Sequence, residues 1–190
     1  MRFAGDRRRR LLWGLVLLAA AAAAGTVGLR WTGSRPRGAP PGPPEPAPGP
    51  VVLDPGHGGI DSGAFYGRVR EKDINLDVAL KVEALLRERG VPVVLTRRED
   101  VELSLRSYRE DLQRRLDVAA RYGAWALVAI HVNSADNPRA RGTVVLYKQD
   151  SPASRQLARA LREELERSDP GRPHLAAIAR ALEAAWRASP

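Results

Sequence analysis

Apolar and polar positions change in regular blocks through residues 51–190, and these blocks predict strands and helices in alternation. Short valine-rich runs read VVLD, VPVVLTR, AWALVAI and TVVLYK, a length and composition typical of buried strands. The longer segments between them carry apolar residues at helical spacing. The expected strands are 51–54, 91–97, 124–130 and 143–148, and the expected helices are 71–90, 107–122, 154–168 and 174–190. This alternation predicts an α/β fold whose sheet is covered by helices on both faces.

Two of these helices carry further local signals. The first is expected to be capped by Asp73 and ended by Gly90, and the second to be ended by Gly123. Each has an apolar stripe that is expected to face the core. The stripes consist of Ile74, Val78, Val82, Leu85 and Leu86 in the first helix, and of Leu112, Leu116, Ala119 and Ala120 in the second.

The N-terminus has a pattern of its own. Residues 1–10 form a basic stub that contains the cluster Arg7–Arg10, and an apolar run without ionisable residues follows at 11–29. A helix over this run would be roughly 28 Å long, close to the about 30 Å of a bilayer's hydrocarbon core. The arginines favour the cytoplasmic side. The run is therefore predicted to be a transmembrane signal anchor, or a signal peptide if it is cleaved at its small residues.

A proline-rich linker at 30–50 separates this run from a domain at 51–190. Eight of the chain's fifteen prolines fall within residues 34–50, which predicts an extended spacer. Residues 1–50 hold eight arginines against two acidic residues, or +6, whereas 51–190 hold 23 basic and 20 acidic residues, or +3. Because most of the net charge of +9 belongs to the N-terminal segment, nucleic-acid binding is not expected. The absence of cysteine excludes disulfides and thiolate metal sites.

Two of the three histidines follow predicted strands. His57 lies in the glycine-rich loop DPGHGG after the first strand, and His131 ends the third strand in AIHVNS. Ligands of open α/β sheets bind at the carboxyl ends of the strands, so both side chains are expected at one rim of the sheet. Glu71 begins the first helix and is expected nearby. The third histidine, His174, is expected to be a helix-start or surface residue.

Two imidazoles and one carboxylate are the ligand set of a hydrolytic zinc site that keeps a position open for water. The same set also suits non-haem iron. Taken singly, each histidine also fits a structural role, and Glu71 fits an acid favoured by a helix N-terminus. It is their combination at strand ends that indicates a metal centre.

The motifs VVLDPGHGG, EKDINLDVALKV, LTR, AIHVNS and GTVVLY, in this order, resemble the zinc-dependent N-acetylmuramoyl-L-alanine amidases of bacterial cell-wall turnover. The resemblance covers residues 51 to about 167 and implies that His57, Glu71 and His131 hold Zn²⁺. It also implies a three-layer α/β/α fold with a mixed, mostly parallel sheet, preceded here by the transmembrane helix. The family hydrolyses the amide between N-acetylmuramic acid and the L-alanine of the stem peptide in peptidoglycan. The domain is therefore expected on the extracytoplasmic face of the bacterial membrane, or secreted if the signal is cleaved.

Three polar neighbours are candidates for supporting roles. Asp54 is expected to buttress His57, or simply to start the turn with Pro55. Asn75 and Asn133 are expected to orient ligands or substrate, with loop-backbone hydrogen bonding as the alternative for Asn133.

The chain departs from the family after the predicted helix at 154–168. Members of the family have a further strand there, with a Val-Glu-x-Gly-Phe-Leu-Ser-Asn pattern whose glutamate is the general acid/base. In this chain ELERSDPGRP leads directly into HLAAIARALEAAW, so an internal segment is missing near 170–175. The remaining glutamates of this region are expected on solvent-facing helix surfaces, and none can take over that role: Glu163, Glu164, Glu166 and Glu183. The alternative to an active amidase is a catalytically impaired relative that binds zinc and peptidoglycan as an anchored wall-binding or regulatory module.

Overall fold

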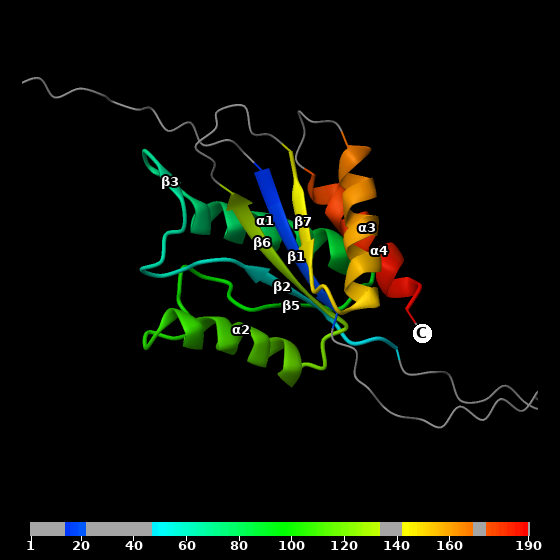
Figure 1. Cartoon of the computed structure of the whole chain (residues 1–190), viewed down its shortest axis with the longest axis horizontal. Helices are drawn as coiled ribbons and strands as arrows, with labels where there is room; N and C mark the ends of the chain where they lie inside the picture. Colours follow the sequence, from blue (N-terminus) through cyan, green and yellow to red (C-terminus); the bar gives the residue numbers. More distant parts are fainter. Residues whose placement is uncertain (1–13, 22–46, 134–141, 169–173, 190) are drawn as a thin grey trace, which may run out of the picture.

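The computed structural model describes residues 14–21, 47–133, 142–168 and 174–189, with the backbone alone for 14–21 and for residue 133. Its centre is a five-stranded sheet with the order β5-β2-β6-β1-β7 (Figure 1). The strands are β1 Gly14–Ala21, β2 Val51–Pro55, β5 Val93–Leu95, β6 Ala126–Asn133 and β7 Val144–Tyr147. A separate hairpin, β3 Phe65–Tyr66 and β4 Val69–Arg70, lies between β2 and the first helix in the chain.

The sheet is mixed. Strands β5, β2 and β6 run parallel to one another, with Val51 opposite both Val93 and Ala126. Strand β1 is antiparallel to β6, and β7 is parallel to β1. Three of the five strands therefore run one way and two the other, as the resemblance implied for a mixed and mostly parallel sheet.

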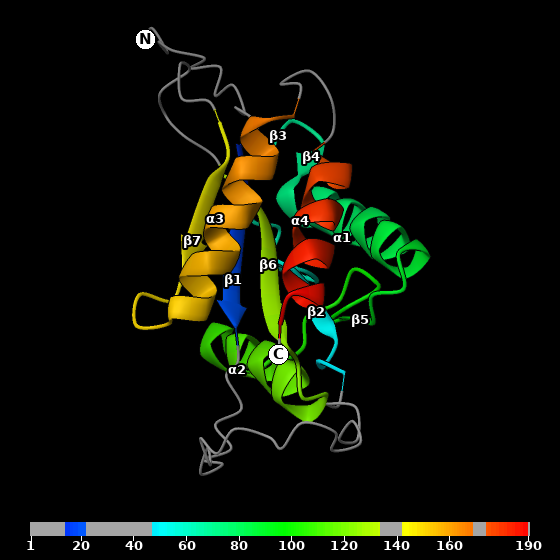
Figure 2. The ribbon, with the colours of Figure 1, turned by 90° about the vertical axis from the view of Figure 1, so that its right-hand side faces the viewer.

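Helices cover the sheet on both faces, which confirms the α/β class (Figure 2). They are α1 Glu71–Glu88, α2 Tyr108–Arg121, α3 Pro152–Glu166 and α4 Leu175–Arg187. Strand β2 shows how the layers divide, because alternate side chains of a strand point to opposite faces. Val51 and Leu53 join the larger core under α1, α3 and α4, whereas Val52 packs with Ala119 of α2.

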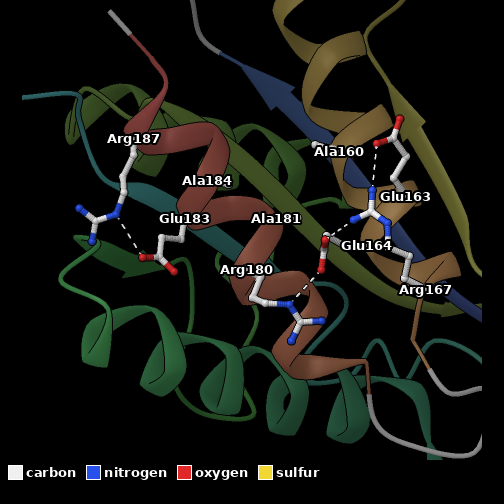
Figure 3. Close-up of a pocket in the computed structure, with 9 residues that line it drawn as sticks. All are labelled: Ala160, Glu163, Glu164, Arg167, Arg180, Ala181, Glu183, Ala184 and Arg187. Carbon is white, nitrogen blue, oxygen red and sulfur yellow. Dashed lines mark hydrogen bonds and ion pairs between the residues drawn. The ribbon is translucent and has the colours of Figure 1, made fainter.

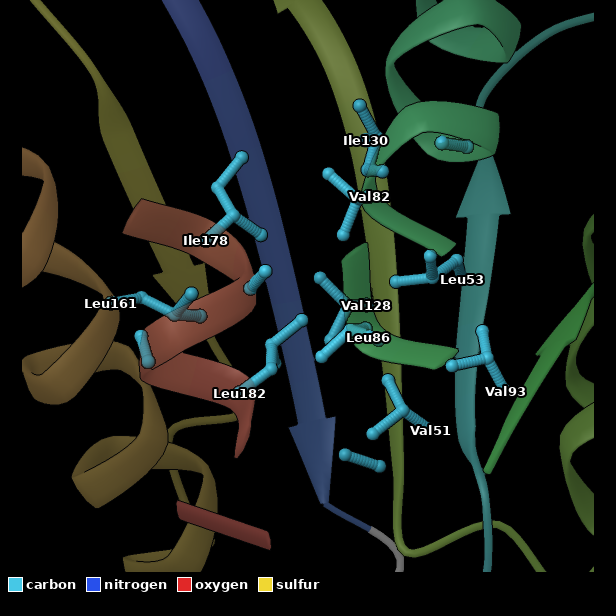
Figure 4. Packing of buried hydrophobic residues seen from close by; sticks show 14 of the residues in the cluster. Val51, Leu53, Val82, Leu86, Val93, Val128, Ile130, Leu161, Ile178 and Leu182 are labelled. Atoms are coloured by element: carbon cyan, nitrogen blue, oxygen red, sulfur yellow. The ribbon is translucent and has the colours of Figure 1, made fainter. Parts of the chain in front are cut away.

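The larger core consists of fully buried aliphatic side chains from the sheet and three helices (Figure 4). Leu161 of α3 and Ile178 and Leu182 of α4 meet Val82 and Leu86 of α1 and the side chains of β2 and β6. The final helix expected from the sequence is present as α4, and its apolar face packs in this core.

Helix α2 buries a different face from the one expected. Of its predicted apolar stripe only Ala119 is buried, whereas Leu112 and Leu116 are 43% and 51% exposed. Asp111 and Arg115 are buried instead, although both are charged. The physical reason is that the inward face of α2 meets the polar loop after β2, where a guanidinium has partners and a leucine has none.

The start of α1 also differs from the prediction. The residue before the helix is Arg70, which makes no side-chain capping bond, and Asp73 lies within the first turn. Asp73 instead forms an ion pair with Arg70 at 2.6 Å. The prediction that Asp73 caps the helix was therefore wrong, although a carboxylate in the first turn is still favourable because of the helix dipole.

The N-terminal run does not form a helix where the structure describes it. Gly14–Ala21 is strand β1, paired with β6 along its whole length and with β7 over Val16–Ala19. An apolar stretch suits a strand buried between two others as well as a membrane helix, and the sheet offers it backbone partners on both sides.

The rest of this region lies outside the described residues: 1–13, the end of the predicted transmembrane run at 22–29, and the linker from 30 to 46. Within the described ranges, no helix combines the length and the apolar character needed to cross a membrane.

Candidate metal centre

The three residues singled out as ligands come from the ends of neighbouring elements. His57 follows β2, Glu71 is the first residue of α1, and His131 lies in β6, one residue past the pairing of Pro55 with Ile130. Potential ligand atoms of the three side chains all lie within 4.8 Å of one another. Parallel pairing of β2 with β6 therefore brings together residues that are 74 positions apart in sequence, counted from His57 to His131.

Glu71 is the centre of the group. Its Oε1 atom lies 3.3 Å from Nε2 of His57 and 3.1 Å from Nδ1 of His131. The two imidazole rings meet edge to face, with centroids 4.8 Å apart. The carboxylate is 7% exposed, whereas the histidine side chains are 20% and 32% exposed. The Glu71 side chain is thus buried, and the cluster of three is accessible to solvent through the two imidazoles.

Two backbone amides fix the Glu71 carboxylate. The Val132 amide donates to Oε1 at 3.0 Å, and the Ala64 amide donates to Oε2 at 3.0 Å. Burial by itself raises the pKa of Glu71, but hydrogen bonds with His131, His57 and the Ala64 amide outweigh burial and hold it well below the usual range. The carboxylate is therefore ionised at neutral pH, as a metal ligand must be.

His57 is held by a carboxylate that the sequence analysis did not single out. Its Nδ1 lies 2.8 Å from Oδ2 of Asp61. The other oxygen of Asp61 accepts a hydrogen bond from the Gly63 amide at 3.0 Å. The hydrogen bond with Glu71 is the main cause that raises the pKa of His57; burial opposes it, and Asp61 adds to it. The available signal was the spacing HGGID, which places an acid four residues after the histidine in the same loop.

Glycines make room for both imidazoles. A Cβ atom on Gly56 would overlap the ring of His131. It would lie 2.1 Å from Cε1, 2.3 Å from Nε2 and 2.6 Å from Nδ1 of that ring. A Cβ on Gly63 would lie 2.6 Å from Cδ2 of His57, and Gly63 also has φ of +62°. The backbone of the loop thus approaches the histidines at a distance that only glycine allows.

The three predicted supporting residues have separate outcomes. Asp54 has its hydrogen bonds with Thr96 and Arg115, not with the ring of His57. Asn75 is fully buried and donates to the carbonyl of Gly56 at 3.1 Å, so it contacts the backbone of the loop. The side chain of Asn133 lies outside the described part of the chain. His174 is the residue before α4, as expected of a helix-start residue.

The glutamates near the C-terminus have arginine partners in a groove between α3 and α4 (Figure 3). The groove has a volume of about 510 Å³, and its lining includes Ala160, Ala181 and Ala184. Glu164 pairs with Arg167 and Arg180, and Glu183 pairs with Arg187 and Arg89. Glu163 and Glu166 form exposed ion pairs along α3. Among the described residues, none of these carboxylates belongs to the His57, Glu71 and His131 group.

Comparison with known proteins agrees with this geometry. A family model described as N-acetylmuramoyl-L-alanine amidase matches residues 51–177. The chain is 33% identical over 125 residues to the germination-specific N-acetylmuramoyl-L-alanine amidase of Bacillus subtilis, covering 62% of this chain and 53% of that protein. It is 38% identical over 121 residues to AmiA of Escherichia coli, covering 63% of this chain and 39% of that protein.

Among solved structures, the CwlD amidase of Clostridioides difficile, determined in complex with the GerS lipoprotein, superposes with a TM-score of 0.56 and 32% identity. That likeness covers 63% of this chain and 66% of the CwlD chain. The chain thus spans about half or less of the length of the two curated relatives. Because the family model matches well over half of the sequence, the chain belongs to the N-acetylmuramoyl-L-alanine amidase family.

Proposed function

We propose that this chain is a zinc-dependent amidase that cleaves the bond between N-acetylmuramic acid and the L-alanine of the stem peptide in peptidoglycan. The observation that carries the proposal is the convergence of His57, Glu71 and His131 within 4.8 Å at the end of β2 and β6. Family membership supplies the reaction class.

The donor set fits zinc. Two imidazole nitrogens and one carboxylate oxygen are borderline ligands of the kind zinc accepts, and three protein ligands leave one position for water or substrate. When bound, the metal polarises the attacked carbonyl and makes water acidic enough to serve as a nucleophile near neutral pH. The imidazoles are the more exposed part of the group, so the amide enters from their side.

The chain's own residues prepare this site before any substrate binds. The amides of Ala64 and Val132 donate hydrogen bonds to the Glu71 carboxylate and fix its position, and Asp61 lies against Nδ1 of His57 so that Nε2 faces Glu71. Interactions of this type orient metal ligands and raise their basicity. Two of the three proposed ligands, His57 and Glu71, are therefore held in fixed orientations by the chain itself.

One observation favours the second candidate function, a zinc- and peptidoglycan-binding module of reduced activity. The four C-terminal glutamates pair with arginines in and directly after α3, in α4 and at Arg89, away from the proposed ligands. General acid/base catalysis typically contributes about 10²–10⁴-fold to a rate. A site that lacks this group turns over slowly but keeps its metal.

Peptidoglycan as substrate places the domain outside the cytoplasmic membrane. The basic cluster followed by the apolar run at 11–29 is the arrangement of an export signal, which supports this location. As a signal anchor, the run would tether the domain to the membrane by a helix. Strand β1 uses residues 14–21 of the same run, so a given molecule has either the anchor or the strand.

The test is a digestion of purified peptidoglycan by the zinc-loaded full chain, with mass spectrometry of released stem peptides that begin at L-alanine. The His57→Ala and His131→Ala variants serve as metal-site controls, and Lys81→Ala, which alters an exposed ion pair with Asp77, serves as a surface control. Chelator-sensitive release that both histidine variants lose supports the amidase. If a folded, zinc-loaded chain releases nothing but co-sediments with insoluble peptidoglycan, the binding module is the correct reading.

A further inference from the structure

Two buried arginines donate hydrogen bonds to the backbone of the loop that carries His57. Arg115 of α2 and Arg97 after β5 are 4% and 3% exposed, and their guanidinium groups reach the loop from two different elements. Charged side chains are rarely buried this fully unless they are paired and hydrogen-bonded, so each has a specific task in the fold.

Every carbonyl from Pro55 to His57 accepts a hydrogen bond from a side chain. The Pro55 oxygen accepts from Arg97 Nε at 2.9 Å and from Arg115 Nη1 at 3.0 Å. The Gly56 oxygen accepts from Arg97 Nη2 and from Asn75 Nδ2, both at 3.1 Å. The His57 oxygen accepts from Arg115 Nη2 at 3.0 Å. Three consecutive peptide groups are thus fixed by side chains from α1, α2 and the segment after β5.

These hydrogen bonds surround a residue with an unfavourable backbone conformation. His57 has φ of +61° and is the one non-glycine residue with positive φ that is recorded for the described parts of the chain. A residue with a Cβ atom resists this left-handed conformation and keeps it only when its surroundings impose it. Arg115 donates directly to the carbonyl of that residue, and on the other side the Gly58 amide donates to the Asp61 carbonyl at 3.0 Å.

The charge of Arg115 is itself compensated within the fold. Its Nε donates to Asp111 at 2.7 Å, and its Nη1 donates to Asp54 at 2.8 Å. Burial lowers the pKa of Arg115, but the two carboxylates outweigh burial and raise it. Asp54 and Asp111 therefore fix the guanidinium, and the guanidinium fixes the His57 loop. This also gives Asp54 a function, one step removed from the histidine that it was expected to contact.

We propose that Arg115 is a positioning residue for the metal centre, which holds the backbone of His57 in the left-handed conformation that aims its imidazole at Glu71 and His131. The planar guanidinium is required because it serves two carboxylates and two carbonyls at once, which a single ammonium cannot do. The inference rests on the proposed metal centre, and its test is therefore chosen to be independent of amidase turnover.

The experiment measures Co²⁺ affinity of the full chain by visible absorption, together with hydrogen exchange of the Gly58 amide in the metal-free protein. The variant is Arg115→Lys. It keeps the positive charge beside Asp54 and Asp111, but it shortens the side chain and replaces the several N–H donors of the planar guanidinium with one ammonium group. The matched control is Arg114→Lys on the same helix, where the arginine is 56% exposed and contacts Glu110 at 3.4 Å. Circular dichroism and thermal unfolding establish that each variant is folded.

We expect Arg115→Lys to bind Co²⁺ about 10–100-fold more weakly, the usual effect of losing an outer partner of a metal ligand. Exchange at Gly58 should become faster, and Arg114→Lys should match the wild type in both readouts. A folded Arg115→Lys chain with wild-type affinity and wild-type exchange overturns the proposal, because a merely structural arginine would change stability alone.

If Arg115→Lys does not fold, Asp111→Asn replaces it, since that change leaves the arginine in place but removes one of the carboxylates that fix it. Weaker Co²⁺ binding and faster exchange support the proposal, and wild-type values overturn it. If the wild-type chain binds no Co²⁺, the metal centre fails as a proposal, and exchange at Gly58 alone decides whether Arg115 holds the loop.

Discussion

Nδ1 of His57 lies 2.8 Å from Oδ2 of Asp61, and this contact decides which ring nitrogen faces the proposed metal centre. An imidazole that donates from Nδ1 presents Nε2 as its free ligand atom. Nε2 is indeed the atom that lies 3.3 Å from Glu71 Oε1. A carboxylate from the same loop thus directs the ring so that Nε2 faces Glu71 and His131.

The first prediction concerns this carboxylate. Asp61→Ala should weaken Zn²⁺ binding by the full chain about 10–100-fold, because the ring loses its orienting partner. The measurement is isothermal titration with Zn²⁺. Asp73→Ala is the matched control, since its carboxylate has the same 41% exposure and pairs with Arg70 at the surface. Equal affinities of the two variants would contradict an orienting role for Asp61.

The second prediction concerns pH and the metal-free protein. The pKa of Glu71 is lower in the folded chain than its ordinary value of 4.5, so its ionised form stabilises the fold above about pH 4.5. This stability should be lost progressively as the pH falls below 4.5 and the unfolded chain binds the proton first, by an amount on the order of 2 kcal/mol.

The check is urea unfolding of the metal-free chain between pH 3 and 7, roughly the range in which this carboxyl titrates in the unfolded state. Glu71→Gln should show a smaller loss of unfolding free energy over the acidic half of that range. If both proteins lose the same free energy, the carboxylates elsewhere in the fold account for the acid sensitivity and Glu71 does not.

The third prediction uses the close approach of backbone to imidazole. Gly56→Ala places a methyl group against the ring of His131, 2.6 Å from Nδ1, so the ring must move or the loop must shift. Zinc binding should fall by more than about 10-fold, because metal sites tolerate displacements of only about 0.5 Å. Gly67→Ala controls for the mutation itself: its added Cβ meets nothing within 4 Å, although its φ of +61° makes it the costlier backbone change. A reversed order of the two effects would argue against a His131 site at this position.

The sequence contains enough information to predict four of the sheet's five strands and the group of three, since strand ends in an α/β fold meet at one rim. His57, Glu71 and His131 could be expected together because each follows or begins an element of strong periodicity. The interior face of α2 could not be predicted in this way. Its pattern favours burying Leu112, whereas the structure buries Arg115, because a polar loop and not an apolar surface lies opposite. The hydrophobic periodicity of a helix shows which of its faces is apolar, but it does not show whether the opposite surface of the fold is apolar or polar.

Strand β1 was beyond prediction for a related reason. The length of the apolar run 11–29 and the basic cluster before it favour a membrane helix, and nothing in the residues themselves indicates that eight of them pair as a strand. The choice depends on whether the sheet has an unfilled position between β6 and β7, which is a property of the whole domain. In the described chain, β7 has β1 as its paired strand, so the sheet extends beyond β6 through the N-terminal segment.

The fourth prediction tests this strand by cross-linking. The chain has no cysteine, so a pair of introduced thiols reports on one contact alone. Leu18 lies opposite Ala129 in the antiparallel pairing of β1 with β6. Opposite residues have Cβ atoms about 4.5–5.5 Å apart, whereas diagonal neighbours lie about 7–8 Å apart, and a disulfide needs about 3.5–4.5 Å. The opposite pair is the one that comes near this distance, so Leu18→Cys with Ala129→Cys should oxidise much faster than Leu18→Cys with Leu127→Cys.

The readout is the mass loss of two hydrogens in the intact chain, measured after mild oxidation of membrane and soluble fractions. In-register cross-linking in the soluble fraction would establish that residues 14–21 complete the sheet in the folded domain. Because the same residues cannot also form a membrane helix, the cross-linked molecules should be missing from the membrane fraction. Equal cross-linking of both cysteine pairs, or of neither, would rule out this register and return the run 11–29 to the role of anchor.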